Sequence, residues 1–413
     1  MNAPNRELTK LRVNPNWAKL PLFDRSKWQR VRFGDVVENL NETEHDPAGA
    51  GIERFIAMEH LEPGSLHIRE WGNVADGTTF NRRCRPGQVL FGKRRAYQRK
   101  VAVAEFDAVV SGDIYVFAPK DDRLLRELLP FLCISERFFN FAVETSAGSL
   151  SPRTNWSSLA NFAFDLPPLA QQHRIAELLI VLDEDKELML KVMAATRDLY
   201  VAETEAKLDE LFHGRCERLD NVLTGSPEGG NSAPPSATET GHYVLSLAAL
   251  SRNGYLKGNL KPILPTKAML ECRLRSGDLL ISRSNTQELV GLAGIFDEDR
   301  HDVSFPDTMM RLRVDDSRID KRFLEAVLRS RRGRRHMMRS AAGTSGSMKK
   351  INRNTLGSCQ IPTPSLHVQG QLLAQMQRIE HSIGLARAAC KSNHAFTRHL
   401  LENIFNKPAF SDE

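Results

Sequence analysis

The sequence predicts an α+β fold made of two tandem copies of one unit, in which a mixed domain is followed by a long helix. Three observations predict it: a strand signature that occurs twice, a closing segment that occurs twice, and a long proline-free run after each closing segment. The length of 413 residues agrees, because a single hydrophobic core stops growing beyond ~250–300 residues. We therefore expect two domains related by an internal repeat.

The strand signature lies at residues 85–94, RPGQVLFGKR, and again at 275–284, RSGDLLISRS. The offset is 275 − 85 = 190. Each copy has the pattern of a turn, a short apolar strand and polar or basic residues at the strand exit. Further along, VSGD at 110–113 resembles VSFPDT at 303–308, and an apolar strand follows each of them. Blocks that recur in one order indicate a duplication.

Each copy closes with a matching segment before its helix. NWSSL at 155–159 matches NRNTL at 352–356, and FDLPPL at 164–169 matches IPTPSL at 361–366. Both pairs have the same offset, 352 − 155 = 361 − 164 = 197. Because proline cannot continue a helix or a central strand, we expect a hinge at each of these junctions.

Residues 171–213 and 368–406 contain no proline, and their apolar residues fall on the 3-4 spacing of a coiled-coil seam. We expect two amphipathic helices that bury these seams against each other, antiparallel; the alternative is that each helix packs on its own domain. Polar residues interrupt the seams at Asp185, Thr196, Asn393 and Thr397. The predicted seam residues are Ile175, Leu178, Leu182, Met189, Val192 and Leu199 in the first helix and Leu372, Met376, Ile379, Ile383, Ala386, Cys390, Leu400 and Ile404 in the second.

The composition excludes several classes of protein. No stretch approaches the roughly 18 apolar residues of a membrane helix, and residues 1–17 lack the apolar core of a signal peptide, so we expect a cytoplasmic protein without a membrane partner. The six cysteines form no CxxC pair, which argues against a zinc site and a disulfide framework. The net charge of +6 fits a polyanionic partner, although inert proteins can be equally basic. Residues 224–241, rich in Gly, Pro and Ser, are expected to form a mobile loop without a catalytic role.

No motif for catalysis survives inspection. GQVLFGKR at 87–94 nearly matches the phosphate loop GxxxxGK[ST], but Arg94 replaces the hydroxyl that should hold magnesium, and an apolar strand replaces the flexible cradle. DLPPL at 165–169 differs from the [DN]PP[YF] motif of amino-methyltransferases, because a leucine separates the acid from the prolines and the aromatic residue is missing. No HExxH, GxSxG or carboxylate cluster is found. We expect no catalytic residue, no metal and no cofactor, so that any enzymatic activity comes from a partner.

Basic and amide side chains gather where the repeated strand ends. Such side chains can form paired hydrogen bonds with guanine or adenine edges in DNA. The alternative is a solvated charged rim. The candidate residues are Lys93, Arg94, Arg95, Tyr97, Arg99 and Lys100 in the first copy and Arg283, Ser284, Asn285 and Gln287 in the second.

A glycine-rich polar loop precedes each closing segment, SAGSLSPRTN at 146–155 and AAGTSGSMKKIN at 341–352. Backbone amides, hydroxyls and cations in such loops suit phosphate contacts, although an ordinary mobile loop has the same composition. A third basic segment, RSRRGRRHMMR at 329–339, is expected to be a phosphate-facing or merely solvated helix face. The candidates from the two loops are Ser149, Arg153, Asn155, Thr344, Ser345, Ser347, Lys349 and Lys350.

In this order the segments resemble the specificity subunit of a type I restriction-modification system, over about residues 28–407. The resemblance rests on the strand signatures RPGQVLFGKRR and RSGDLLISRSN, the two glycine-rich loops, the junctions LPPLAQQHRIAELL and IPTPSLHVQGQLL, and the helix ends LDELFHG and LLENIFN. It implies two target recognition domains in tandem, separated by two long antiparallel helices that form a coiled coil. Each domain would read one half of a bipartite site in double-stranded DNA, and the helices would set the gap.

The resemblance also implies partners. Two methyltransferase subunits would dock on residues 171–213 and 368–406 and supply the S-adenosylmethionine chemistry, and a restriction subunit would join the complex. The second junction, LHVQG at 366–370, lacks the Gln-Gln pair of the first, which leaves open whether the two docking surfaces are equivalent. Two other functions remain open: recognition for a different methyltransferase-nuclease system, and a coiled-coil adaptor that never touches DNA.

The repeat and the resemblance together predict the domain boundaries. An N-terminal extension precedes the first recognition domain, and a short tail follows the second helix. We expect the extension at residues 1–27, target recognition domain 1 at 28–168, the central helix at 169–213, target recognition domain 2 at 214–365, the C-terminal helix at 366–407 and the tail at 408–413.

Overall fold

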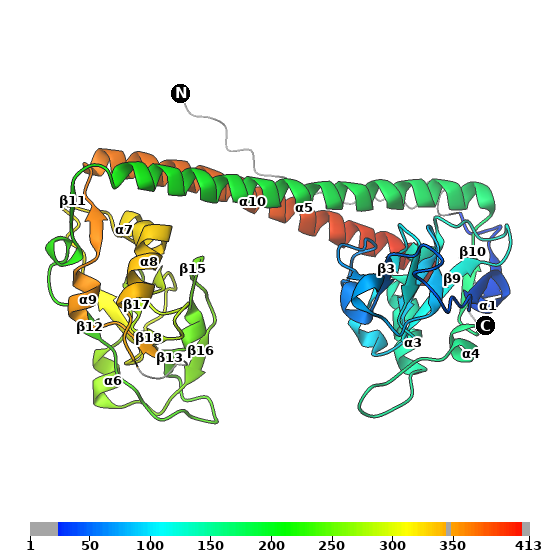
Figure 1. The fold of residues 1–413 in the computed structure, drawn as a ribbon. Helices are drawn as coiled ribbons and strands as arrows, with labels where there is room; N and C mark the ends of the chain where they lie inside the picture. The colour runs from blue at the N-terminus through cyan, green and yellow to red at the C-terminus, as the bar shows by residue number, and fades with distance from the viewer. Residues whose placement is uncertain (1–23, 344–347, 407–413) are drawn as a thin grey trace. The chain divides into compact units, whose positions relative to one another are not determined.

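The computed structural model describes residues 24–343 and 348–406 of the chain (Figure 1). They divide into two compact units, the first comprising residues 24–190 and 388–406 and the second residues 191–343 and 348–387. Each long helix therefore contributes one part to each unit. The predicted tail and most of the predicted N-terminal extension lie outside the described residues.

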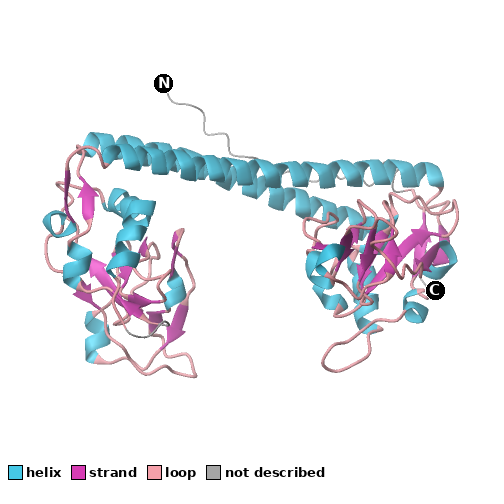
Figure 2. Cartoon of the chain, viewed as in Figure 1, coloured by secondary structure: helices cyan, strands magenta, loops and turns pink. Residues whose placement is uncertain are grey.

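Two four-stranded sheets and a short pair of strands form the first unit (Figure 2). One sheet has the order β2-β9-β6-β7 and the other β4-β3-β8-β5, in which β3 and β8 are parallel. Strand β1 (Gln29–Arg32) pairs antiparallel with β10 (Ala163–Leu166), so the start of the domain lies beside its end. The remaining strands are β2 (Val37–Leu40), β3 (Arg54–Ile56), β4 (Gly72–Asn73), β5 (Arg82–Cys84), β6 (Val89–Gly92), β7 (Val101–Val103), β8 (Ala108–Val110) and β9 (Ile114–Pro119), and the helices are α1 (Phe33–Val36), α2 (Leu129–Cys133), α3 (Glu136–Glu144) and α4 (Trp156–Leu159).

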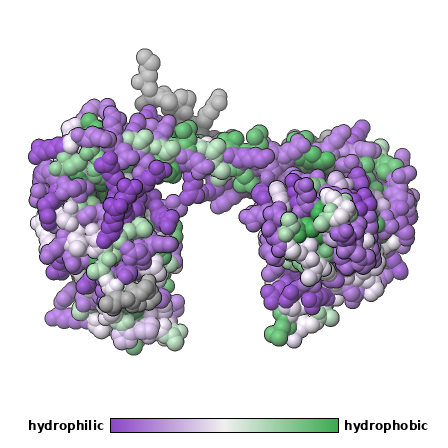
Figure 3. Space-filling view, viewed as in Figure 1, coloured by the Kyte–Doolittle hydropathy of each residue, from purple (hydrophilic) through white to green (hydrophobic). Residues whose placement is uncertain are grey.

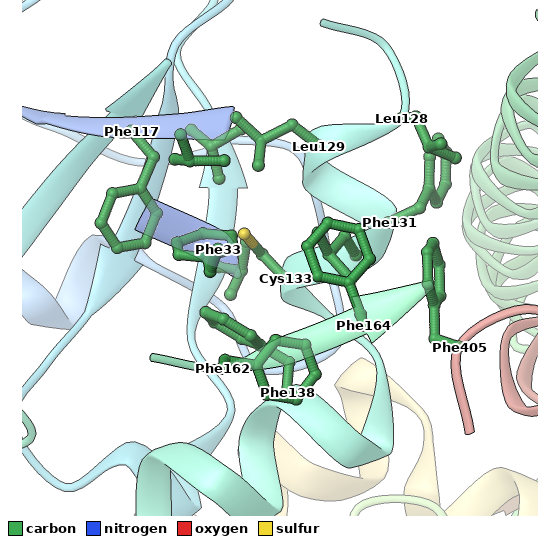
Figure 4. Packing of buried hydrophobic residues seen from close by; sticks show 14 of the residues in the cluster. Phe33, Phe117, Leu128, Leu129, Phe131, Cys133, Phe138, Phe162, Phe164 and Phe405 are labelled. Atoms are coloured by element: carbon green, nitrogen blue, oxygen red, sulfur yellow. The ribbon is translucent and has the colours of Figure 1, made fainter. Parts of the chain in front are cut away.

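Alternation along β6 and β9 divides the core of the first unit into two clusters. Val89 and Phe91 face one cluster, whereas Leu90, between them, faces the other. This follows from the two-residue period of a strand, which points neighbouring side chains to opposite faces. The larger cluster is aromatic: the rings of Phe33 and Phe138 lie 4.7 Å apart, and Phe405 from the end of the second long helix joins them (Figure 4).

The second unit repeats this arrangement with different elements. Its four-stranded sheet has the order β12-β21-β17-β19, and a three-stranded sheet has the order β16-β13-β20, in which β13 and β20 are parallel. Strand β17 (Leu279–Ser282) divides its side chains as β6 does, with Leu280 in one cluster and its neighbours in the other. The other strands are β11 (Cys216–Arg218), β12 (Glu228–Gly229), β13 (Tyr243–Leu245), β14 (Leu250–Ser251), β15 (Gly254–Tyr255), β16 (Leu260–Pro262), β18 (Ser284–Asn285), β19 (Ala293–Ile295), β20 (Val303–Ser304), β21 (Met309–Leu312), β22 (Lys349–Lys350) and β23 (Gln360–Pro362), and the helices are α6 (Lys267–Glu271), α7 (Lys321–Arg329), α8 (Arg331–Ser340) and α9 (Arg353–Gly357).

Part of the predicted mobile loop at 224–241 is ordered by a charge cluster. Strand β12 pairs with β21, and Glu228 accepts hydrogen bonds from Arg311 Nε at 2.7 Å and Arg313 Nε at 3.0 Å. Asp278 also accepts from both arginines. Arg311 is only 8% exposed, and a buried guanidinium requires such paired acceptors. The prediction of a mobile loop rested on the Gly, Pro and Ser content, which does not indicate that Glu228 is bound by two arginines.

The two proline-free runs form the long helices α5 (Leu169–Leu211) and α10 (Leu366–Leu401), and α10 continues into a π-helical turn at Glu402–Asn406. In the second unit, Tyr200 donates to Glu380 at 3.0 Å and Gln375 donates to Glu203 at 3.2 Å. The residue numbers rise on one helix as they fall on the other, so the helices are antiparallel. The predicted fold class is confirmed.

In the first unit, two polar residues that interrupt the predicted seams contact each other across the helix pair. Asn393 donates to Asp185 at 2.9 Å and to the carbonyl of Leu182 at 3.2 Å, and it is 9% exposed. A buried asparagine at a seam position fixes register at some cost in stability. The seam residues predicted on α10 are all buried or half-buried.

On α5 the structure differs from the predicted seam at two residues. Val192 is 51% exposed and Leu199 60% exposed, whereas their neighbours Met193 and Tyr200 are half-buried. The 3-4 spacing admits both registers, and the apolar residues alone favoured the wrong one. Tyr200 is selected because its hydroxyl bonds Glu380 on α10.

Each of the two junctions is held by a buried glutamine of its own. Gln172 accepts from the backbone amide of Leu125 at 2.8 Å and donates to the carbonyls of Arg123 and Pro167 at 2.7 and 2.8 Å. Gln369 repeats all three bonds, accepting from Asp320 at 2.8 Å and donating to Arg318 at 3.1 Å and Pro364 at 2.9 Å. The offset, 369 − 172 = 197, is that of the closing segments. The second junction therefore keeps the second glutamine of the pair and loses only the first.

Candidate nucleic-acid interface

In the first unit, the strand exit after β6 meets the glycine-rich loop that precedes α4. The amide of Lys93 donates to the carbonyl of Asp113 at 2.9 Å, and the amide of Thr154 donates to the carbonyl of Lys93 at 3.1 Å. Two bonds between Ala147 and Arg153, of 3.0 and 2.9 Å, close the loop into a hairpin. We call residues 147–153 the exit hairpin. The two segments that the sequence singled out separately are thus adjacent.

The second unit builds the same backbone frame. The amide of Arg283 donates to Thr308 at 2.8 Å, and the amide of Ile351 donates to Arg283 at 3.0 Å. Ala342 and Lys350 exchange two bonds of 2.9 Å, as Ala147 and Arg153 do in the first unit. Thr344, Ser345 and Ser347, which the sequence proposed as phosphate contacts, lie outside the described residues.

Asp113 organises the cations of the first strand exit. Its carboxylate accepts from Arg153 Nε at 2.9 Å and from Arg94 at 3.4 Å. Burial alone would raise the pKa of Asp113, but the bonds and charges of Arg153 and Arg94 outweigh it and lower that pKa. The Ser151 hydroxyl, on the exit hairpin, accepts from Arg94 at 3.1 Å and from Arg95 at 3.3 Å. Three guanidinium groups around one carboxylate leave a net positive site.

Lys93 lies against an aromatic ring. Its ammonium is 4.9 Å from the centroid of the Tyr115 ring, and Arg82 lies 6.0 Å from the same ring. Burial and, after it, the charge of Arg82 lower the pKa of Lys93. Such a cation is already partly dehydrated, so its transfer to a phosphate or a base edge costs less than for a fully hydrated lysine.

Arg99 and Lys100 are bound to other parts of the domain. Arg99 forms a two-pronged bond with Glu136 on α3, and Lys100 donates to the carbonyl of Met58 at 2.6 Å. Arg95 and Arg99 have φ of 53° and 56°, in the left-handed region that non-glycine residues rarely adopt. Between them a short 3-10 turn presents Tyr97, 55% exposed. Tyr97 is thus the exposed tip of this segment.

Asn155, a DNA-contact candidate, caps a helix. Its side-chain oxygen accepts from the amide of Ser158 at 2.8 Å and from the hydroxyl of Ser157 at 2.7 Å, at the start of α4. Asn352 caps α9 in the same way, accepting from Thr355 at 2.8 Å. The repeated asparagine therefore has a structural explanation, because N-cap positions favour this residue. Of the other loop candidates, Ser149 and Arg153 are exposed.

The second strand exit exposes fewer of its candidates. Ser284 is 4% exposed, so its hydroxyl does not face solvent. Gln287 donates to the carbonyl of Met338, and Lys349 donates to that of Gly343 at 2.7 Å. Arg283 and Lys350 are exposed, and Asn285 is half-exposed beside them through the β18-β22 pair.

Several residues at these sites were not predicted from the sequence. Arg283 lines a pocket of ≈ 540 Å³ together with Asn352, Arg353 and Asn354. Ser151 and Asp113 order the first site, as described above. Asp113 ends the VSGD block that the repeat comparison found, so its place in the repeat was the available signal.

The basic run at 329–339 combines arginines that are bound within the second unit with arginines that are exposed. Arg332 pairs with Asp209 of α5 at 2.8 Å, and Arg334 donates to the carbonyls of Val290 at 2.7 Å and Glu288 at 2.9 Å. Burial lowers the pKa of Arg334 to about 10. Arg332 and Arg334 thus attach α8 to α5 and to the loop after β18, whereas Arg331, Arg335 and Arg339 are exposed.

In residues 24–343 and 348–406 no helix is long and apolar enough to cross a membrane. Within the same residues, no group of three or more His, Cys, Asp or Glu side chains could hold a metal ion.

Residues of the first unit match a known family. Residues 25–192 match the family model described as the type I restriction modification DNA specificity domain. The specificity subunit of the type I restriction enzyme EcoDI, from Escherichia coli, is 26% identical over 168 residues. The match covers 38% of this chain and 36% of the length of that curated relative.

Solved structures share the fold over most of the chain. One is a chain from work on complex assembly and conformational transition of the type I R-M system; it has a TM-score of 0.59 at 20% identity, and the match covers 91% of this chain and 97% of that chain. Another is the S subunit of a type I restriction-modification system from M. genitalium, with a TM-score of 0.50 at 13% identity and coverage of 97% and 99%. The resemblance predicted from the sequence is confirmed.

Proposed function

We propose that this chain, as a specificity subunit of the type I restriction-modification family, recognises a bipartite sequence in double-stranded DNA through its two recognition domains. The observation that carries the proposal is the duplicated strand exit. Each unit joins a strand end to a hairpin by the same backbone bonds, and each presents a different set of side chains from that frame. Two readers of different half-sites require this combination of shared backbone and different surface.

The contacts that we assign follow from exposure and charge. In the first domain, Lys93, Arg94 and Arg153 are the cations that face the site, and Arg95 and Tyr97 flank them. In the second domain, Arg283, Asn285 and Lys350 have the corresponding places. Arginine, lysine and asparagine can read guanine and adenine edges, and arginine and lysine can also bind phosphate.

Binding-site selection tests this proposal. The purified full chain, alone and with its methyltransferase partner, is incubated with a random duplex pool, and the retained duplexes are sequenced. We expect two short fixed sequences at a fixed spacing, and affinity for them that falls steeply with salt as phosphate-bound cations are displaced. Failure to retain duplex, or affinity that is insensitive to salt, would support the coiled-coil adaptor instead. Salt-dependent retention of random sequence would show DNA binding without sequence recognition and would also contradict the proposal.

We also infer that catalysis belongs to the partners. Two methyltransferase subunits would dock on the helices α5 and α10, and a restriction subunit would join them. The matching glutamine anchors, Gln172 and Gln369, support similar geometry at the two junctions. Sequencing of methylated bases in cells with and without this chain tests this, because methylation at the selected site should require it.

The helices would set the distance between the half-sites. Inserting a heptad into α5 together with one in α10, at paired positions, should change the preferred spacing and leave both half-site sequences unchanged. Site selection with the lengthened chain measures it. A spacing that does not respond to helix length would contradict this role.

A further inference from the structure

Leu150 is the most exposed large apolar side chain among those that the structure describes as exposed, at 91%; the next is Leu188 at 61%. It lies in the exit hairpin, on the loop between α3 and α4 that extends from the lower end of the first unit in Figure 1. The same end of that unit shows a hydrophobic tip in the space-filling view (Figure 3). A leucine held in water in this way forgoes the burial that normally stabilises it.

The hairpin that carries Leu150 is firmly held at its base. Besides the two bonds between Ala147 and Arg153, the amide of Arg95 donates to the carbonyl of Pro152 at 2.7 Å, and Ser151 accepts from Arg94 and Arg95. A loop fixed at this many points presents its tip in a defined direction, so binding loses little conformational entropy.

The residues around Leu150 are small and the base is cationic. Gly148, Ser149 and Ser151 flank it, so leucine is the one bulky side chain of the tip. Arg94, Arg95 and Arg153 surround the base with a single carboxylate among them. An apolar protein partner would not favour three arginines, whereas a polyanion with an apolar interior, stacked bases between two phosphate backbones, fits both features.

We propose that Leu150 is a wedge that enters a base-pair step when the first domain binds its half-site, while the arginines at the hairpin base hold the flanking phosphates. Insertion of an apolar side chain between base pairs unstacks the step and kinks the duplex. The half-site would then be selected partly for a step that unstacks easily, a form of readout that needs no hydrogen bond to a base. This inference rests on the proposed function.

The test uses the full chain and duplexes that carry the selected site, with 2-aminopurine placed in turn at each position of the first half-site. Its fluorescence rises when the base is unstacked. With the unchanged protein we expect a rise at one step, and with Leu150→Ser we expect that rise to disappear and affinity to fall by about 5- to 100-fold. Leu256→Ser, the same change at a leucine that is 43% exposed in the second unit, is the matched control.

A rescue experiment sharpens the result. A mismatch at the signalling step removes part of the cost of unstacking before the protein binds. The affinity of Leu150→Ser for the mismatched duplex should therefore approach that of the unchanged protein. Loss of folding does not explain such a rescue.

Three results would overturn the wedge. Sequence-selective binding with equal fluorescence for both proteins would do so and leave the proposed function intact. The wedge would also be wrong if fluorescence does not rise at any position and binding weakens when thymine is replaced by uracil. Uracil lacks the methyl group of thymine, so Leu150 would then contact that methyl group instead of entering the stack. Unchanged DNA binding with weakened assembly of the methyltransferase partner would identify a protein contact. If the unchanged protein selects no sequence, the proposed function itself fails.

Discussion

The two strand exits share a backbone and differ in charge chemistry. In the first unit the exit residues Lys93 and Arg94 lie beside an acid, Asp113, that binds two arginines. In the second unit the counterparts are Arg283, the buried Ser284, and Thr308, which brings no negative charge. The difference indicates that backbone bonds and helix caps hold the frame, so the exposed side chains that it carries can differ between the two units.

The strongest test of the shared frame is at the glutamine anchors. We expect Gln172→Ala to lower the free energy of unfolding by about 2–4 kcal/mol, because one buried amide and two carbonyls lose their partner. Gln369→Ala should cost about the same. Urea denaturation measures both, and Gln377→Ala, at an exposed glutamine of α10, is the control. A large cost at one anchor and none at the other would contradict the equivalence of the two junctions.

The difference between the reading surfaces is tested by half-site binding. Lys93→Ala with Arg94→Ala should weaken binding by about 1–3 kcal/mol if either residue contacts a base, and only for sites with the correct first half. Arg283→Ala should have a similar effect confined to the second half. Titration against duplexes with one half scrambled measures this. A uniform loss on every duplex would identify phosphate contacts instead.

Replacing Asp113 at the first strand exit should produce a smaller difference between the two units, in their stability. Asp113→Asn should lower the free energy of unfolding by about 1 kcal/mol, because its partners Arg94 and Arg153 are half exposed and water screens the charges. Thr308→Ala, at the counterpart position, should have less effect, since no cation depends on it. Thermal denaturation of the two variants compares them; equal losses would show that the charge of Asp113 has no separate role.

The first unit also has a pH-sensitive clamp. His67 bonds Asp183 of α5 at 3.0 Å and Glu105 at 3.0 Å, and the bond to Asp183, opposed by burial and aided by Glu105, raises the pKa of His67 to about 9. A raised pKa means that the charged form stabilises the fold. The contribution is full below pH ~6.5, the unfolded value, and is lost as pH rises through about 9.

We expect this clamp to contribute about 1 kcal/mol or less, because the imidazole is 38% exposed and screened. Between pH 6 and pH 10 the free energy of unfolding, measured by urea denaturation, should fall more for the unchanged protein than for His67→Gln. The pKa of His67 can be read from its NMR titration. A pKa near 6.5 would rule out the clamp.

Much of the fold could be predicted from the sequence, because duplication makes each copy a test of the other. The strand signatures, closing segments and helices recur at offsets of 190 to 197 residues, and the structure contains matched elements at these places. The candidate cations Lys93, Arg94 and Arg283 also lie at the predicted strand exits, and Arg153 of the predicted loop lies beside the first exit through its bond to Asp113. Local periodicity and repetition are properties of the chain itself, so no tertiary information was needed to find them.

Only the tertiary structure could decide which candidates are free to act. Asn155 and Ser284 are residue types that suit DNA contacts, but Asn155 caps the start of α4 and Ser284 is buried. Val192 and Leu199 fit an apolar seam by spacing, but Tyr200 lies in the interface, where its hydroxyl donates to Glu380 of α10. The sequence determines which side chains are present and at what spacing along the chain. Exposure and pairing depend on segments far apart in the chain, and for that reason folding alone settles them.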